Sequence, residues 1–385
     1  MATDGKKTDH PDGTRQAPEY EVLATRRGTL RYKERLADRT DPSHFRLRER
    51  LYFSSIGCGT YLGDPDDATD AQYENALWRA IELGCNVIDT AINYRHMRSE
   101  RVIGRVLKRL TANNPAAREE IIVATKGGFI PFDGEPPADP VRYIKRRFIE
   151  RHVIIPEDIV GGGHCMTPEF LEDQLEQSLQ NLQLECVDIY YVHNPETQLD
   201  HVPRKKFYTQ LHQVFQMLER KATEGKIHFY GLATWNGFVV YPDDKQHLPL
   251  GGIVELARMA GGDNHHMRFI QLPFNFRLLD AFSSQTQLIE RREMSILDAA
   301  KCCDVAVVVS APLLQGRLSA RLPAEVQKFV PGLKSDAQRS IQFARSAPGV
   351  LSALVGMKSP AHVEENLALA AHPCLRDEEF LKMFE

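Results

Sequence analysis

The chain has 385 residues, of which 42% are hydrophobic and 26% are charged, and its formal net charge is −4. This composition suits one large α/β domain or two small ones, and it excludes the basic footprint of a nucleic-acid-binding protein. The longest apolar runs are far shorter than the roughly 20 residues that a membrane-spanning helix needs. We therefore expect neither a nucleic-acid nor a membrane partner.

The first 45 residues are polar and charged, and they contain no apolar stretch that would indicate a secretory signal. We predict a flexible N-terminal extension over residues 1–45, with a short helix near residues 28–37, and a folded domain over residues 46–385. The seven cysteines show no Cys-x-x-Cys spacing, which favours buried thiols in a reduced, cytoplasmic protein.

From residue 46 on, short apolar runs alternate with amphipathic stretches. The predicted strands are residues 55–58, 87–89, 121–125, 187–193, 228–232, 269–272, 305–310 and 350–355. The predicted helices are residues 71–83, 100–110, 168–182, 207–224, 252–259, 288–302, 335–344 and 360–371. Eight strand–helix units with largely apolar strands predict a (β/α)8 TIM barrel. A doubly wound sheet should begin with a G-x-G-x-x-G turn, and the glycine-rich turn at residues 57–63 lacks that spacing.

One connection is long for a barrel. About 40 residues separate Lys126 from Thr167, so the third barrel strand is followed by a long insertion loop over residues 131–165. Its middle, residues 141–152, has helical character and several basic side chains. The pattern is typical of a solvated surface helix, or alternatively of an active-site cover, because loops that follow barrel strands lie at the catalytic face.

Polar residues stand where several predicted strands end. Asp89, Lys126 and His193 close three strands, and Tyr94 follows the first of them closely. Barrel strand ends converge on one pocket. A tyrosine titrates near 10, an adjacent ammonium lowers that pKa, and an aspartate would keep a buried lysine charged. The pattern predicts a general acid–base site in which Tyr94 transfers the proton and His193 polarises the reacting oxygen.

These residues stand in motifs that resemble the aldo-keto reductases, over about residues 53–366. The corresponding motifs here are Asp89-Thr90-Ala91, Tyr94, Ser99-Glu100, Gly104, Ala124-Thr125-Lys126 and Tyr191-Val192-His193. The resemblance implies a catalytic tetrad of Asp89, Tyr94, Lys126 and His193. It also implies hydride transfer between a nicotinamide cofactor and a small carbonyl or alcohol, such as an aldehyde, a ketone or a sugar.

The resemblance further implies a site for NADP, with NAD as the alternative. The implied cofactor residues are Gly59, Thr60, Thr234, Gln271, Ser310, Pro312, Leu313, Gly316, Arg317, Lys358, Ser359, His362, Glu365 and Asn366. Ser359 and Pro360 also have the pattern of a helix start, which can hold an anion such as a 2′-phosphate. The chain departs from the family at three places. Ala233-Thr234 replaces a Ser-Asn pair, Ser310 replaces an aromatic residue, and His362 replaces an arginine.

Aromatic side chains are predicted to line the substrate pocket: Tyr61, Phe129 and Trp235. No four-ligand set has the spacing of a zinc site, so we expect no metal. The sequence thus favours an NADP-dependent oxidoreductase. Two alternatives stay open, a cofactor-binding regulatory or sensor protein and a non-redox dehydratase or lyase on the same fold.

Overall fold

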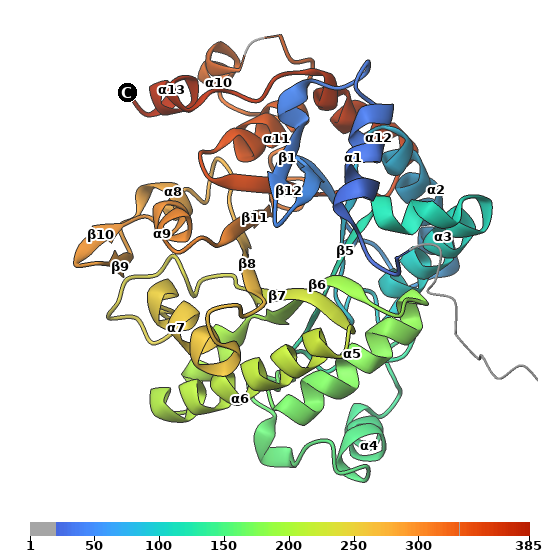
Figure 1. Ribbon diagram of the computed structural model, residues 1–385, viewed down its shortest axis with the longest axis vertical. Helices are drawn as coiled ribbons and strands as arrows, with labels where there is room; N and C mark the ends of the chain where they lie inside the picture. Colours follow the sequence, from blue (N-terminus) through green and yellow to red (C-terminus); the bar gives the residue numbers. More distant parts are fainter. Residues whose placement is uncertain (1–20, 331) are drawn as a thin grey trace, which may run out of the picture.

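The computed structural model describes residues 21–330 and 332–385, and its centre is a closed barrel of eight parallel strands (Figure 1). The strands follow one another around the barrel in chain order, with the last pairing the first. They are β3 (Ile56–Gly59), β4 (Val87–Asp89), β5 (Ile122–Gly127), β6 (Val187–His193), β7 (Ile227–Ala233), β8 (Met267–Pro273), β11 (Ala306–Ser310) and β12 (Val350–Gly356). The predicted (β/α)8 TIM barrel is confirmed.

A ring of helices surrounds the barrel (Figure 1). They are α2 (Asp67–Glu82), α3 (Arg98–Asn113), α5 (Pro168–Leu182), α6 (Arg204–Thr223), α7 (Leu250–Gly261), α9 (Ile296–Cys302), α11 (Asp336–Ser346) and α12 (Pro360–Leu367). Shorter helices are α8 (Asp280–Ser283), α10 (Ala324–Phe329) and α13 (Asp377–Leu381). Within the described residues, no helix combines the length and the apolar character needed to cross a membrane.

Alternate residues of each strand point into the barrel or towards the helices. In β6, Ile189 and Tyr191 belong to the cluster inside the barrel, whereas Tyr190 and Val192 belong to the larger cluster beneath the helices. This alternation follows from the pleat of a strand. It explains why both faces of the strands are apolar, because each face is buried against a different layer.

An antiparallel hairpin of β1 (Phe45–Arg48) and β2 (Leu51–Ser54) precedes the barrel. Its Leu51 and Phe53 belong to the cluster inside the barrel. Since β2 is followed directly by the first barrel strand, this hairpin lies at the N-terminal end of the barrel. The opposite end is therefore left for the site.

The expectation of a flexible extension over residues 1–45 is wrong for the part that the structure describes; residues 1–20 lie outside it. The predicted short helix is present as α1 (Arg26–Arg35), and it packs on the barrel. Tyr32 is fully buried and donates to the carbonyl of Ile81 at 2.5 Å. Arg31 and Arg35 pair with the buried Glu120 at 2.7 and 2.6 Å. These contacts join distant parts of the chain, so local composition did not reveal them.

The predicted helix over residues 288–302 is wrong in its first half. Residues there form a hairpin of β9 (Gln287–Ile289) and β10 (Arg292–Met294), and α9 begins only at Ile296. The two turn residues, Glu290 and Arg291, have φ values of 48° and 66°. Such a turn normally carries Asn or Gly. The hairpin is held instead by the buried Gln287, which bonds the backbone of neighbouring loops.

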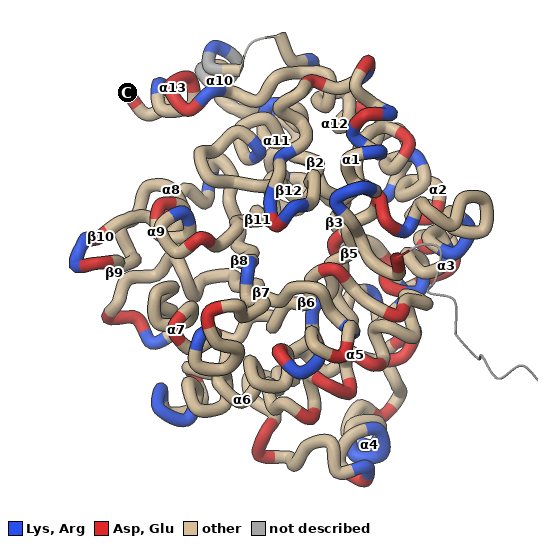
Figure 2. Tube along the Cα trace, in the orientation of Figure 1, with Lys and Arg blue, Asp and Glu red and all other residues tan. Residues whose placement is uncertain are grey.

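The insertion after β5 forms a short helix, α4 (Pro140–Ile144), continued by a π-helical turn, and it projects beyond α5 and α6 (Figure 1). Phe148 is buried against Phe170 of α5, and Arg147 pairs with Asp173 of the same helix at 2.8 Å. Figure 2 shows the basic residues gathered on this helix. The surface-helix interpretation is confirmed. Residues 131–163 do not line the main cavity in this structure, so the active-site cover stays a prediction.

Candidate active site

A cavity of about 680 Å³ opens where the barrel strands end. It brings together residues from every part of the sequence, because the carboxyl ends of parallel barrel strands meet at one face. All the predicted site residues line it except Lys126, Arg317 and Ser359. Those lining it are Gly59, Thr60, Tyr61, Asp89, Tyr94, Phe129, His193, Thr234, Trp235, Gln271, Ser310, Pro312, Leu313, Gly316, Lys358, His362, Glu365 and Asn366.

Lys126 lies directly beneath the cavity wall. It is fully buried, and its Nζ donates to Oδ1 of Asp89 at 2.5 Å and to the carbonyl of Thr90 at 2.8 Å. The same Nζ lies 5.0 Å from the centroid of the Tyr94 ring. Burial disfavours an ammonium, but the attraction of Asp89 and Tyr94 outweighs it and raises the pKa of Lys126. The lysine is therefore a fixed positive charge under Tyr94.

The pKa of Tyr94 departs from the sequence expectation. Burial raises the pKa of its phenol above the ordinary value, and the nearby Lys126 only partly opposes this. The phenol thus keeps its proton at neutral pH. A protonated phenol held over a buried ammonium suits donation of a proton to an oxygen on which negative charge develops.

His193 packs edge-on against Tyr94, with their ring centroids 5.9 Å apart. Burial and the charge of Lys126 lower the pKa of His193 well below its ordinary value. Its imidazole is therefore neutral near pH 7 and can donate one hydrogen bond. Tyr94 is also packed edge-on against Tyr61, at 5.0 Å between ring centroids.

The backbone after Tyr94 is unusual. Arg95, His96 and Met97 all have positive φ values, from 48° to 68°, a conformation that costs an L-residue about 1–2 kcal/mol each. The side chain of Arg95 is buried and pairs with Asp70 of α2 at 2.5 Å. It also donates to the carbonyl of Asp64 at 2.9 Å. This anchor offsets the cost of the turn that carries Tyr94.

The far end of the cavity lies at the start of α12. Ser359 is the N-cap, accepting from the N–H of His362, and Pro360 is the first helical residue, as the sequence predicts. Lys358 stands exposed beside it. Asn366, on the same helix, has a buried amide oxygen without a hydrogen-bond partner among the described residues. An anionic group fits the helix start, and a polar ring fits beside Asn366.

Gln271, one of the implied cofactor residues, also has a partner within the protein. Its amide nitrogen donates to Oδ2 of Asp89 at 2.8 Å, so it braces the Asp89–Lys126 pair. Thr234 has a buried hydroxyl without a partner in the part of the chain that the structure describes. Its backbone N–H donates to the carbonyl of Gln271 at 2.8 Å. Thr234 is therefore the better placed of the two to bond a ligand amide.

Several lining residues escaped the sequence analysis. Asn93 and Asn194 line the cavity, and each adjoins a candidate catalytic residue. Tyr73 and Leu62 line it as well, and the hydroxyl of Tyr73 donates to the carbonyl of Leu62 at 2.7 Å. Adjacency to Tyr94 and His193 was a usable signal for the two asparagines. Tyr73 lies on α2, and nothing in its local pattern distinguishes it from a core residue.

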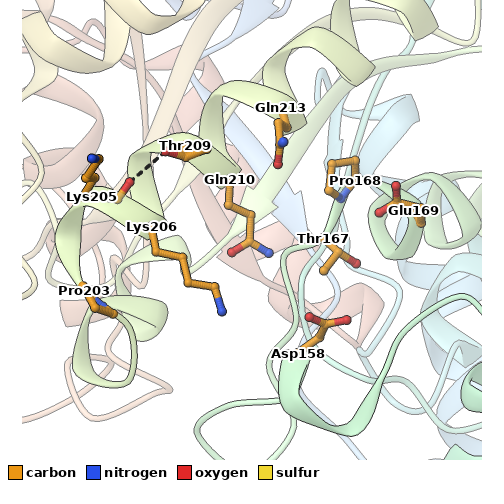
Figure 3. A pocket seen from close by; sticks show the side chains of 10 residues that line it. All are labelled: Asp158, Thr167, Pro168, Glu169, Pro203, Lys205, Lys206, Thr209, Gln210 and Gln213. Carbon is orange, nitrogen blue, oxygen red and sulfur yellow. Dashed lines mark hydrogen bonds between the residues drawn. The ribbon is translucent and has the colours of Figure 1, made fainter.

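A second hollow, of about 820 Å³, lies between the amino-terminal ends of α5 and α6 (Figure 3). Its wall mixes Asp158 and Glu169 with Lys205 and Lys206, so opposite charges offset one another. None of the candidate catalytic residues lines it. Among residues 21–330 and 332–385, no three His, Cys, Asp or Glu side chains cluster as metal ligands would.

Comparisons with known proteins agree with this arrangement. Residues 55–241 match the model of the aldo/keto reductase family. The NADH-specific methylglyoxal reductase of Escherichia coli is 24% identical over 288 residues, 73% of this chain and 69% of the relative. The L-galactose dehydrogenase of Arabidopsis thaliana is 25% identical over 306 residues, 75% of each chain. A putative voltage-gated potassium channel subunit beta of Schizosaccharomyces pombe is 25% identical over 200 residues, 52% of this chain and 47% of the relative.

Solved structures share the fold. An aldo-keto reductase of Bacillus halodurans in its holo form superposes with a TM-score of 0.58 at 19% identity, covering 89% of this chain and 96% of the other. An aldo/keto reductase of Klebsiella pneumoniae in complex with NADP and acetate gives 0.56 at 21% identity, covering 89% and 94%. The family match over residues 55–241, the relatives and the shared barrel confirm the resemblance to the aldo-keto reductases.

Proposed function

We propose that this protein is an NADP-dependent oxidoreductase that interconverts a small carbonyl compound and its alcohol, with Tyr94 as the general acid and base. One observation carries the proposal. A single cavity joins Tyr94, whose ring lies over a buried lysine–aspartate pair, to a capped helix start at its far end. The relatives named as a methylglyoxal reductase and an L-galactose dehydrogenase, and the neighbour solved with NADP, support it.

When bound, the nicotinamide cofactor supplies or accepts the hydride. Tyr94 donates its proton to the carbonyl oxygen as that oxygen becomes an alkoxide, and it takes the proton back in the reverse direction. The buried charge of Lys126 stabilises the phenolate left behind. Asp89 holds Lys126 in place, and Gln271 holds Asp89.

His193 directs the substrate oxygen towards Tyr94. Its neutral ring donates a hydrogen bond to that oxygen, and its position 5.9 Å from the Tyr94 ring allows both side chains to reach one atom. Proton transfer of this kind typically contributes roughly 10²- to 10⁴-fold to a rate.

The residues at the two ends of the cavity fit a dinucleotide. Thr234 and Asn366 each have a buried polar atom without a partner among the described residues, and Lys358 and Ser359 stand at the start of α12. In our proposal Thr234 bonds the carboxamide, and Lys358 and Ser359 hold the 2′-phosphate. The remaining cofactor residues predicted from the sequence, including Arg317, complete this site.

The aromatic side chains around Tyr94 form the substrate wall in this proposal. Phe129 packs 5.1 Å from the His193 ring, and Tyr61 and Trp235 stay 55% and 44% exposed at the cavity mouth. Apolar rings beside polar asparagines suit a small aldehyde, ketone or sugar.

We also propose a cytoplasmic location, since all seven cysteines are free thiols and four of them are buried. The division at residue 46 into an extension and a barrel domain stays a prediction, although α1 of the extension packs on the barrel.

Titration of the purified protein with NADPH and with NADH, followed by cofactor fluorescence, tests cofactor binding. A panel of carbonyl compounds that includes methylglyoxal and aldoses then tests turnover, followed by the loss of cofactor absorbance. We expect tight NADPH binding and a rate that falls at least about 10²-fold in Tyr94→Phe, with NADPH affinity retained. Tyr241→Phe, exposed and outside the cavity, is the matched control and keeps the rate.

Other results would favour the alternatives. NADPH binding without turnover would indicate a regulatory or sensor protein; one relative is named as a putative potassium channel subunit. Substrate conversion without net cofactor oxidation would indicate a dehydratase or lyase. Failure to bind either dinucleotide would overturn the proposal.

A further inference from the structure

The insertion after β5 returns to the barrel through a buried histidine. His164 is fully buried, and its backbone bridges Phe129 on one side and Val160 on the other. It therefore lies where the insertion rejoins the chain just before α5. Nothing in the acid–base chemistry proposed above uses this residue.

Both ring nitrogens of His164 have partners. Nε2 lies 2.8 Å from the carbonyl oxygen of His193, and Nδ1 lies 2.8 Å from the amide nitrogen of Gln198. The carbonyl can only accept and the amide nitrogen can only donate. The ring is thus neutral, with its proton on Nε2, donating to His193. Burial is consistent with this, since it lowers the pKa of His164 to about 4.

The close approach of His164 to the end of β6 depends on Gly128. This glycine has a φ of +149°, and a Cβ there would lie 2.7 Å from the carbonyl oxygen of His193 and 3.1 Å from Nε2 of His164. Both distances are shorter than ordinary contacts. Any other residue at position 128 would separate His164 from His193, so the local chain is shaped around their hydrogen bond.

The side chain of His193 has no comparable anchor of its own. Its Nδ1 is buried and lacks a hydrogen-bond partner among the described residues. A catalytic histidine is usually oriented by a hydrogen bond at its second nitrogen. Here the ring is oriented by Phe129, which packs 5.0 Å from His164 and 5.1 Å from His193. Its position then depends on the backbone that His164 holds.

We infer that His164 is a positioning residue for the reaction: it fixes the end of β6 and the Phe129 ring, and through them the imidazole of His193. This rests on the proposed function, in which His193 directs the substrate oxygen. The insertion then has a role that does not require it to close over the site, because its residue His164 holds the backbone of His193. A displacement of about 1 Å at a catalytic group can cost roughly 10²-fold in rate.

A double-mutant cycle tests the inference in the full-length protein. His164→Leu removes the donor and should lower kcat about 10- to 100-fold with the KM for the carbonyl within about twofold. His164→Gln keeps an N–H donor and should restore kcat to within about threefold of the wild type. In a His193→Asn background, His164→Leu should have almost no further effect, because residues that act as a unit are not additive.

His44 supplies a matched control. It is also fully buried, with Nε2 at 2.9 Å from the carbonyl of Gly84 and Nδ1 at 3.0 Å from the hydroxyl of Ser55, at the opposite end of the barrel. His44→Leu should lower stability to a similar extent, measured by urea unfolding, and leave kcat of the folded protein unchanged. Additive effects of the His164 and His193 substitutions, or a kcat lost equally in His164→Gln and His164→Leu, would overturn the inference.

The positioning role of His164 can also be tested without a turnover assay. If the wild type reduces no carbonyl, the proposed function fails, and ¹⁵N imidazole NMR spectra of the same variants decide the question. His164→Leu should shift the His193 ring signals, whereas His44→Leu should not. Unshifted His193 signals in His164→Leu would overturn the positioning role.

Discussion

The two ends of the barrel both bury an aspartate paired with a cation, and they differ in what surrounds the pair. At the N-terminal end, both carboxylate oxygens of Asp188 are used by the protein itself. They accept from Arg118 at 2.9 Å and from the backbone N–H groups of Ala24 and Val123 at 2.6 and 2.8 Å. Among the described residues, Nε of Arg118 and Nδ1 of the nearby His228 have no hydrogen-bond partner, but both carboxylate oxygens of Asp188 are bonded.

At the cavity end, Asp89 is likewise held by Lys126 and Gln271. Around it, however, the hydroxyl of Thr234 and Nδ1 of His193 are buried without a partner in the described part of the chain. Buried polar groups in folded proteins are nearly always hydrogen-bonded. A buried charge therefore does not by itself mark a site; Asp89 differs from Asp188 because Asp89, His193 and Thr234 line one cavity.

Substitution of the two aspartates should separate these roles, and it has the largest expected effect. Asp188→Asn breaks a buried pair and should lower the unfolding free energy by about 3–5 kcal/mol, with kcat per folded molecule unchanged. Asp89→Asn should lower kcat roughly 10²-fold or more, because Lys126 loses the charge that keeps it protonated. Urea unfolding and cofactor absorbance measure the two effects. Equal kcat losses in the two variants would remove the distinction.

The pH dependence of the reaction rates tests the protonation states of Tyr94 and His193 at the cavity end. Reduction requires a protonated Tyr94. Because the pKa of Tyr94 is raised above the ordinary value of 10.0, the phenol keeps its proton up to at least about pH 10, and the rate of reduction should stay constant up to that pH. Oxidation needs the phenolate and should accelerate roughly tenfold per pH unit through the neutral range. The lowered pKa of His193 keeps its ring neutral, so reduction stays level down to about pH 6. Stopped-flow rates would contradict this if reduction fell away near pH 7.

A smaller effect is expected where α1 packs against the N-terminal end. Arg31 donates to Glu120 at 2.7 Å and to the carbonyl of Ala116 at 2.8 Å. Its side chain is 37% exposed, so solvent screens the pair, and Arg31→Ala should cost only about 0.5–1 kcal/mol of unfolding free energy. Arg26→Ala, on the exposed side of α1, is the control. Turnover should be the same in both variants, and a loss of kcat in Arg31→Ala would place α1 in the function.

Much of the site could be predicted from the sequence because its residues lie at the ends of strands. Strand positions such as 87–89 and 187–193 are recognisable from local apolar runs, and a closed parallel barrel brings their carboxyl ends together. The capped start of α12 was readable too, since Ser359 and Pro360 act on their own helix. Because these features depend on neighbours along the chain, the barrel, the candidate acid–base residues and the far end of the cavity could be predicted without a structure.

Other features exist only through contacts between distant residues. Gln271 donates to Asp89 across 182 positions, so its amide nitrogen braces the Asp89–Lys126 pair. Burial raises the pKa of Tyr94, although the adjacent lysine alone would lower it. The hairpin at residues 287–294, the packing of α1 and the support of His193 by His164 likewise depend on partners from other elements. These features could not be predicted from the chain, because desolvation and hydrogen-bond partners are properties of the folded environment rather than of the local sequence.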